Sequence, residues 1–461
     1  MKAVVLTVLA GCSFIYNPSN VESDKTDAQQ IFDADPSMLA VLSSDTPTIY
    51  EAEGDGSRQA VLVIRGHNFV PDLSVTIATT TANPPTVTID PSQLGVSADH
   101  EMLAIPVKVP QSDALTASDA VHYDVTVSQR GFSQTLTDAF VVQGLPELRG
   151  TGTTALPANP PTYSLVDLES MSVSGTAKIA LHAIGSIKIS GAISLDSTGQ
   201  AGGPGGSSGG AGATGGGGDS GAGMGPAHAS GNGIGATWVG DDQLSTFGTG
   251  NDQSSGGSGG GTGALGAGGP GGGGGGLLEL GAGGDLSIGT ITAKGGNGAK
   301  SNLNMNPGGG GSGGAVILRS GGSITAAVDI SGGTGNTAGG PGRVRADAPT
   351  SITGVALTPS ASPFRGPTFA TDTPMIVTST DVKLNVTAQP QHSIQYYINN
   401  FDGSKSFGPQ TVLVPSNGVL ALQPGENLFT GRNELCVIVE GAQPTATDAG
   451  QCISIAYLYT P

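Results

Sequence analysis

Residue types that carry enzyme chemistry are sparse in this chain. The middle of the sequence offers single acids, Asp196, Glu279 and Asp329, which lie tens of residues apart. Cleavage of a glycan would need paired carboxylates, or a lysine and arginine cluster on one face. No GxSxG or HExxH string occurs, and the six histidines are scattered. The sequence therefore predicts no catalytic residues, no cofactor and no metal site.

A second group of residues could contact a ligand. The stretch Ala236 to Phe247 contains the single tryptophan of the chain, Trp238, followed by Asp241, Asp242 and Phe247. An aromatic ring beside carboxylates suits contact with a sugar or a Ca²⁺-assisted contact. The alternative is that this stretch is a hydrophobic plug that pins a loop to the rest of the protein.

Two cysteines, Cys436 and Cys452, lie close together near the end of the chain. Two strands of one hairpin could bring them together as a disulfide, provided that the protein is exported to an oxidising compartment. A zinc site is the competing interpretation, but two cysteines without a nearby histidine supply half a coordination shell.

The first residues of the chain indicate the cellular compartment in which the protein is found. Met1-Lys2 is followed by an apolar run and then by VLAGC, which ends at Cys12. This string resembles the lipobox of bacterial lipoproteins, and the resemblance implies that residues 1–12 are a signal peptide with Cys12 as the lipidated residue. Such an acylated cysteine would hold the protein on a membrane. Ser13 in the next position implies export to the outer membrane.

Glycine dominates the composition. The 461 residues include 78 glycines, and 57 of these fall between Gly199 and Gly342.

Acids outnumber bases by 36 to 18, for a formal net charge of −18. A nucleic-acid-binding protein needs positive charge to neutralise phosphates, so nucleic acid is excluded as a partner. The composition shifts predict a flexible tether over residues 13–35 and domains over 36–147, 163–348 and 369–461.

The first domain has short alternating segments that predict antiparallel strands. In it, Gly66-His67-Asn68-Phe69 follows a strand, and a later strand contains Ala139 to Val142. These features resemble the IPT/TIG immunoglobulin-like family, in which a strand leads into a G-x-N-F turn and the last hairpin carries A-F-x-V. The resemblance implies a small β-sandwich and names no activity.

The middle domain contains an internal repeat. The segments 177–199, 276–298 and 314–335 each predict a strand, a tight turn, a second strand, a short third strand and a glycine-rich exit. The predicted inward residues are Ile179, Leu181, Ile187, Ile189 and Ile193, then Leu278, Leu280, Leu286, Ile288 and Ile291, then Val316, Leu318, Ile324, Ala326 and Val328. Stacked copies would form a continuous core, so we expect a short β-solenoid or three-sided β-helix. The alternatives are another compact β-sheet unit and disorder.

The glycine tracts keep a register of three residues, as in Gly203, Gly206 and Gly209 and in Gly269, Gly272 and Gly275. This register suits polyproline II segments, which have three residues per turn and pack closely where glycine faces a neighbour. The alternative is a pair of long disordered loops.

The last domain again alternates in seven short segments, and ALQPGENLFTGRNELCVIVEG resembles bacterial immunoglobulin-like modules. The expected fold class is therefore all-β, with two immunoglobulin-like sandwiches flanking a glycine-rich β-solenoid-like domain. The expected function is adhesion or cell-envelope structure at the outer membrane, by non-covalent contact with polysaccharide, matrix or another protein. The alternative is a glycan-active enzyme or a carbohydrate-binding accessory protein.

Overall fold

The computed structural model describes residues 38–459, except 47, 55–58, 113–114, 118, 158, 176, 212–222, 224–234, 237–267, 301–306 and 441–450. The regular structure in these residues is almost entirely β-strand, with short 3-10 turns at Pro91–Gln93 and Gly425–Asn427. The predicted all-β fold class is confirmed. Within the described part of the chain, no helix has the length and apolar character needed to cross a membrane.

The first unit is a two-sheet sandwich. One sheet has the order β1-β3-β7-β5 with β6 paired to β7, and the other has the order β2-β9-β8-β4. Phe69, Tyr123 and Phe140 fill the space between the sheets, and the rings of Tyr123 and Phe140 stack with centroids 5.1 Å apart. The strands are β1 (Ala40–Ser44), β2 (Thr48–Tyr50), β3 (Val61–His67), β4 (Ser74–Ala78), β5 (Thr88–Ile89), β6 (Gly95–Val96), β7 (Met102–Lys108), β8 (Ala120–Gln129) and β9 (Phe132–Gln143).

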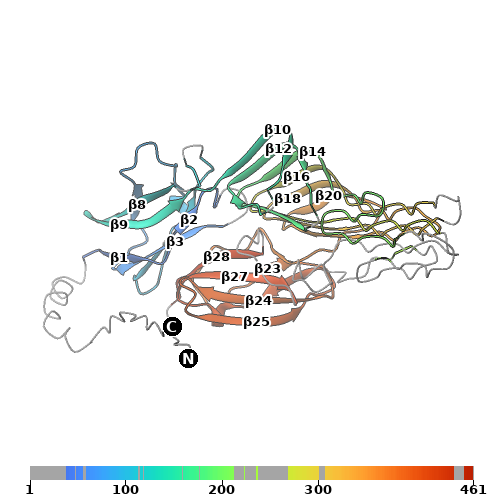
Figure 1. Cartoon of the computed structure of the whole chain (residues 1–461). Coiled ribbons are helices and arrows are strands. Elements are labelled where there is room, and N and C mark those ends of the chain that lie inside the picture. The colour runs from blue at the N-terminus through green and yellow to red at the C-terminus, as the bar shows by residue number, and fades with distance from the viewer. Residues whose placement is uncertain are drawn as a thin grey trace, which may run out of the picture.

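The middle unit, here called the repeat unit, consists of two parallel sheets that face each other (Figure 1). Each turn of the chain adds one strand to each sheet. One sheet contains β10 (Glu147–Ala155), β12 (Leu165–Ser172), β14 (Ile187–Ser194), β16 (Leu286–Thr292), β18 (Ser323–Asp329) and β20 (Ser351–Thr358). The other contains β11 (Thr162–Tyr163), β13 (Ile179–Ala183), β15 (Leu277–Ala282), β17 (Ala315–Ser320) and β19 (Arg343–Asp347).

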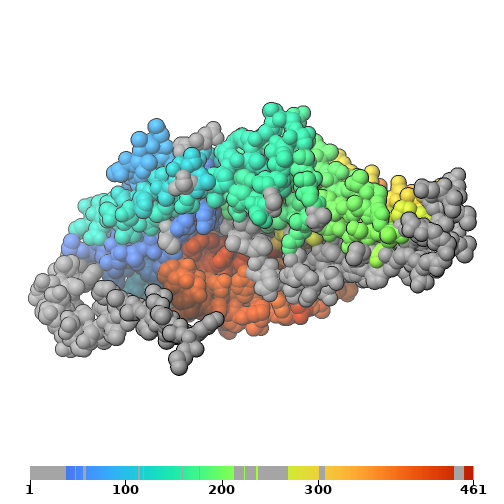
Figure 2. Space-filling model, in the orientation of Figure 1, coloured from blue at the N-terminus to red at the C-terminus, as the bar shows by residue number. Residues whose placement is uncertain are grey.

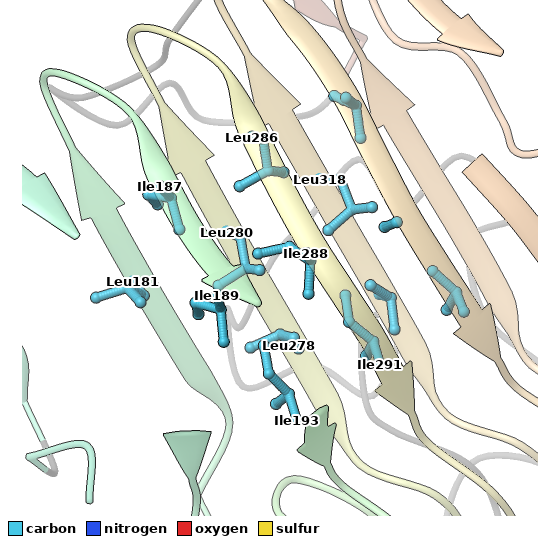
Figure 3. Packing of buried hydrophobic residues seen from close by; sticks show 14 of the residues in the cluster. Leu181, Ile187, Ile189, Ile193, Leu278, Leu280, Leu286, Ile288, Ile291 and Leu318 are labelled. Carbon is cyan, nitrogen blue, oxygen red and sulfur yellow. The ribbon is translucent and has the colours of Figure 1, made fainter. Parts of the chain in front are cut away.

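The apolar residues that the internal repeat aligns form the core between these two sheets (Figure 3). All the predicted inward residues of the three copies belong to this core. The strand register also pairs them in order: Ile179 lies beside Leu278, and Leu278 lies beside Val316. Side chains of alternating residues point to one face of a strand, so this in-register stacking follows from the period of two in the sequence.

The predicted third short strand of each copy is wrong as a separate element. It continues the second strand, because an irregularity in the register near Ser190-Gly191 re-aims the chain and leaves Ile193 facing the core. A comparable shift occurs between Ile288 and Thr290 in the next turn. Such bulges bend a strand without ending it. Each turn of the repeat unit therefore has two strands, and the turns after β14, β16 and β18 insert a glycine-rich excursion in place of a third side.

The last unit is a second sandwich. Its sheets have the orders β21-β23-β26 and β22-β28-β27-β24-β25. Cys436 and Cys452 are direct partners across β27 and β28 and form a disulfide. The strands are β21 (Thr368–Phe369), β22 (Ile376–Val377), β23 (Leu384–Thr387), β24 (Ser393–Asn400), β25 (Ser406–Leu413), β26 (Val419–Leu422), β27 (Gly431–Val439) and β28 (Cys452–Tyr457).

The last sandwich packs against the first, so the chain folds back on itself (Figure 2). Val61, Val63 and Met102 of the first sandwich share a buried apolar cluster with Ala456 and Leu458 of the last. Two hydrogen bonds border this cluster. The Arg65 side chain donates to the carbonyl of Thr430 at 3.1 Å, and the Gln59 amide donates to the carbonyl of Thr373 at 2.8 Å.

The disulfide gives a first testable prediction. It closes a loop with a sequence separation of 16, and a loop of this size restricts the unfolded chain enough to contribute about 3 kcal/mol. We expect the Cys436→Ala/Cys452→Ala variant to lose about this free energy of unfolding in urea. Dithiothreitol should destabilise the wild type by a similar amount and leave the double variant unchanged. Equal stability of the two proteins under oxidising conditions would contradict the prediction.

Candidate functional site

Glycine-rich segments continue from the strand ends of the repeat unit and run away from the first sandwich (Figure 1). We call their described parts the glycine bundle, which comprises residues 199–211, 235–236, 268–276, 293–300, 307–314 and 330–342. These residues lie outside the named strands, yet they exchange backbone hydrogen bonds with one another throughout.

The hydrogen bonds of the bundle recur every third residue. Toward segment 199–211, the amides of Gly271, Gly274 and Leu277 donate to the carbonyls of Gly210, Ser207 and Pro204. Toward segment 307–314, the amides of Gly272 and Gly275 donate to Gly309 and Ser312. Toward segment 293–300, the carbonyls of Pro270 and Gly273 accept from Ala299 and Gly296.

Segment 268–276 therefore bonds to three neighbouring segments, and successive residues face different neighbours. This is the periodicity of polyproline II helices, which have three residues per turn and no internal hydrogen bonds. The described parts of the tracts agree with the predicted polyproline II packing, and not with the alternative of unstructured loops. Because the segments bond to one another, their buried backbone groups are paired.

Glycine is required here because the backbones are in direct contact. A Cβ placed on Gly272 would lie 1.8 Å from the carbonyl oxygen of Gly296, and one on Gly275 would lie 2.2 Å from that of Ala293. Gly311 and Gly269 are equally confined, at 1.9 Å from Gly273 and 1.7 Å from Ala299. These distances are shorter than any van der Waals contact, so no other residue fits without separating the segments.

The predicted ligand-contact residues Trp238, Asp241, Asp242 and Phe247 lie outside the described residues. In the sequence, the described residue nearest to them is Ala236, whose exposed fraction is 1%. Its amide donates to Gly310, and its carbonyl accepts from Gly340, both at distances below 3 Å. The chain that enters this stretch is thus fixed in the glycine bundle. Nothing in the sequence marks Ala236 as an anchor.

Two of the three scattered acids of the repeat unit lie around one lysine, and the third lies elsewhere. Asp196 and Asp329 both meet Lys294: its amide donates to Asp196 at 2.7 Å, and its Nζ lies 2.9 Å from Asp329. Burial raises the pKa of the Asp329 carboxyl, but hydrogen bonds from Lys294 and Ser331 outweigh burial and lower it. The hydrogen bond between Lys294 and Asp329 also raises the pKa of Lys294. Sequence reasoning missed this cluster, whose members lie at the ends of the neighbouring strands β14, β16 and β18.

Glu279 faces the other side of the repeat unit, within a buried ionic cluster. Its carboxylate pairs with Arg319 at 3.0 Å, and Asp347 pairs with Arg345 at 2.6 Å. Gln451 of the last sandwich donates to Asp347 at 3.0 Å. Each of these carboxylates is therefore held by a buried guanidinium group. The cluster joins the repeat unit to the last sandwich, and its members lie too far apart in sequence to be grouped by motif.

The remaining predicted sites are cysteines. Cys12 lies outside the described residues. Cys436 and Cys452 lie within reach of Glu434, in the one trio that the described residues offer with metal-ligand spacing. Their sulfurs are joined in the disulfide, which leaves no thiolate for a metal.

The site and the fold together define an all-β protein with two sandwiches, a parallel two-sheet repeat unit and a glycine bundle. No protein-family model matches the chain, and the curated proteins yield no match. Among solved structures, part of the chain is similar to the solution structure of the TIG domain from human nuclear factor of activated T-cells, cytoplasmic 4, at 16% identity. The alignment covers 24% of this chain and 93% of that one, with a TM-score of 0.17.

The close approach of the glycine segments gives a second prediction. We expect Gly272→Ala to lower the free energy of unfolding by about 1–3 kcal/mol, because the new methyl group must push the carbonyl of Gly296 aside. Amide hydrogen exchange over residues 293–300 should accelerate as well.

Gly281→Ala is the matched control. Gly281 is also buried, but there an added Cβ would meet the His182 ring, a side chain that can move. We expect a smaller loss of stability and unchanged exchange in the bundle. Equal losses of stability for the two variants would show that backbone contact is not the reason why glycine is required in the bundle.

Proposed function

We propose that this protein is a lipid-anchored adhesion or cell-envelope protein, exposed at the outer membrane. In this proposal the repeat unit is a short β-solenoid, and residues 237–267 make non-covalent contact with polysaccharide, matrix or another protein. The observation that carries the proposal is the anchoring of Ala236. Ala236 lies two residues before Trp238 in the sequence, so the chain has a fixed position where it enters this segment.

In this proposal, attachment of the protein to the membrane depends on Cys12. The lipobox resemblance predicts that this residue becomes acylated, and two or more acyl chains give stable membrane attachment. The predicted tether over residues 13–35 would then let the sandwiches stand away from the lipid, on the order of 25 to 30 Å for a flexible chain.

The third prediction tests the anchor. In a Gram-negative host, the full-length chain should incorporate radiolabelled palmitate, and globomycin should shift it to a larger precursor. Cys12→Ser should abolish both effects, whereas Cys436→Ser should keep the label because that residue lies in the last sandwich. Protease added to intact cells should cleave the wild type. Unchanged mass under globomycin, or full resistance of intact cells, would contradict the proposal.

The fourth prediction tests the contact. An aromatic ring that stacks on a ligand contributes about 0.5–1.5 kcal/mol, so we expect Trp238→Ala to weaken binding to glycan- or matrix-coated surfaces by about twofold to tenfold. Phe132→Ala is the control, since Phe132 is an exposed aromatic residue on the first sandwich. Reducing ends should not increase during binding. Release of sugar by the wild type would favour the glycan-active alternative instead.

A further inference from the structure

A polar groove of about 460 Å³ lies where the stack of glycine segments ends. It is bounded by the ends of β12 and β14 and by the first glycine segment. Between β12 and β13 the chain makes a short link, residues 173–178, whereas the later turns of the repeat unit insert glycine segments. Segment 199–211 therefore has a neighbour on the side of residues 268–276 and an open side toward residues 171–175.

The walls of the groove are held in place before any ligand arrives. Thr198 and Ala201 exchange two backbone hydrogen bonds of 3.1 Å, and the Ser197 hydroxyl donates to the Ala201 carbonyl at 2.6 Å. The amide of Lys294 donates to the Asp196 carboxylate at 2.7 Å, which fixes the direction of that side chain. A preformed site loses little free energy to ordering on binding.

The lining consists mainly of hydroxyl groups and glycine backbone. Ser172, Ser174, Ser194 and Thr198 contribute hydroxyls, and Asp196 contributes the one charged side chain of the lining. Ser172, Ser174 and Ser194 are exposed, and within the described part of the chain their hydroxyls make no hydrogen bond to protein. These groups can donate and accept, whereas Asp196 accepts.

We infer that this groove binds a neutral glycan. Sugar hydroxyls match a lining of hydroxyls and one carboxylate, because each can serve as donor to Asp196 and as acceptor from a serine. An anionic saccharide would meet Asp196, the one charged side chain of the lining, and like charges repel. The volume lies within the range of small-ligand sites, about 300 to 1,000 Å³. This inference rests on the proposed function and gives it a second contact, separate from Trp238.

The experiment screens the full chain on an array of neutral hexasaccharides, with cellohexaose, maltohexaose and xylohexaose as probes and hexagalacturonate as the anionic comparison. Calorimetry then measures the strongest binder. Ser194→Trp places a large ring in the groove from an exposed position of β14. Ser287→Trp places the same ring on an exposed position of β16, outside the groove. Asp196→Asn keeps the acceptor oxygen for Lys294 and removes the charge.

We expect Ser194→Trp to weaken binding of the neutral hexasaccharide by about tenfold or more, and Ser287→Trp to leave it within about twofold. Asp196→Asn should weaken binding by a few fold while thermal unfolding stays unchanged. Equal affinity of Ser194→Trp and the wild type, preference for hexagalacturonate, or no binding of any neutral probe would overturn the inference. Binding that is lost in Trp238→Ala but kept in Ser194→Trp would reject the groove and leave the proposed function intact.

Discussion

Backbone contact between glycine segments is the constraint on which the rest of the structure depends. The segments approach until an added Cβ would lie about 2 Å from a neighbouring carbonyl oxygen, as at Gly272 and Gly311. At that distance the hydrogen-bonding groups of one extended segment reach three neighbours, and each pairing repeats every third residue. In the described segments, glycine is therefore a packing requirement. Glycine's entropy cost on ordering is offset by the backbone hydrogen bonds that only such close segments can form.

The parallel sheets set the register of this bundle. Leu278 lies beside Ile179 and Val316 in neighbouring strands, so successive turns leave the sheets at equivalent positions and deliver their glycine segments side by side. The apolar core between the sheets and the glycine bundle beyond them are thus two parts of one stack. The ionic cluster around Asp347 and the apolar cluster around Val63 and Leu458 then fix the last sandwich against both earlier units.

Local pattern explains which parts of this structure could be predicted. The inward residues of the three copies were predictable because alternation shows which side chains share a face. The strands β10, β12 and β20 fall outside the aligned copies because no glycine-rich exit follows them in the sequence. Lys294 and Asp196 are 98 positions apart in the sequence, and they pair only because their turns of the chain stack side by side. The position of Ala236 depends on bundle partners that no local pattern encodes.

The same constraint that builds the bundle limits what it can recognise. A surface of glycine backbone carries almost no side-chain chemistry, and its hydrogen-bonding groups are largely used between segments. Specific contact therefore has to come from residues at the margins of the bundle, where side chains can be tolerated. The described margin toward β12 offers a fixed carboxylate and free hydroxyls.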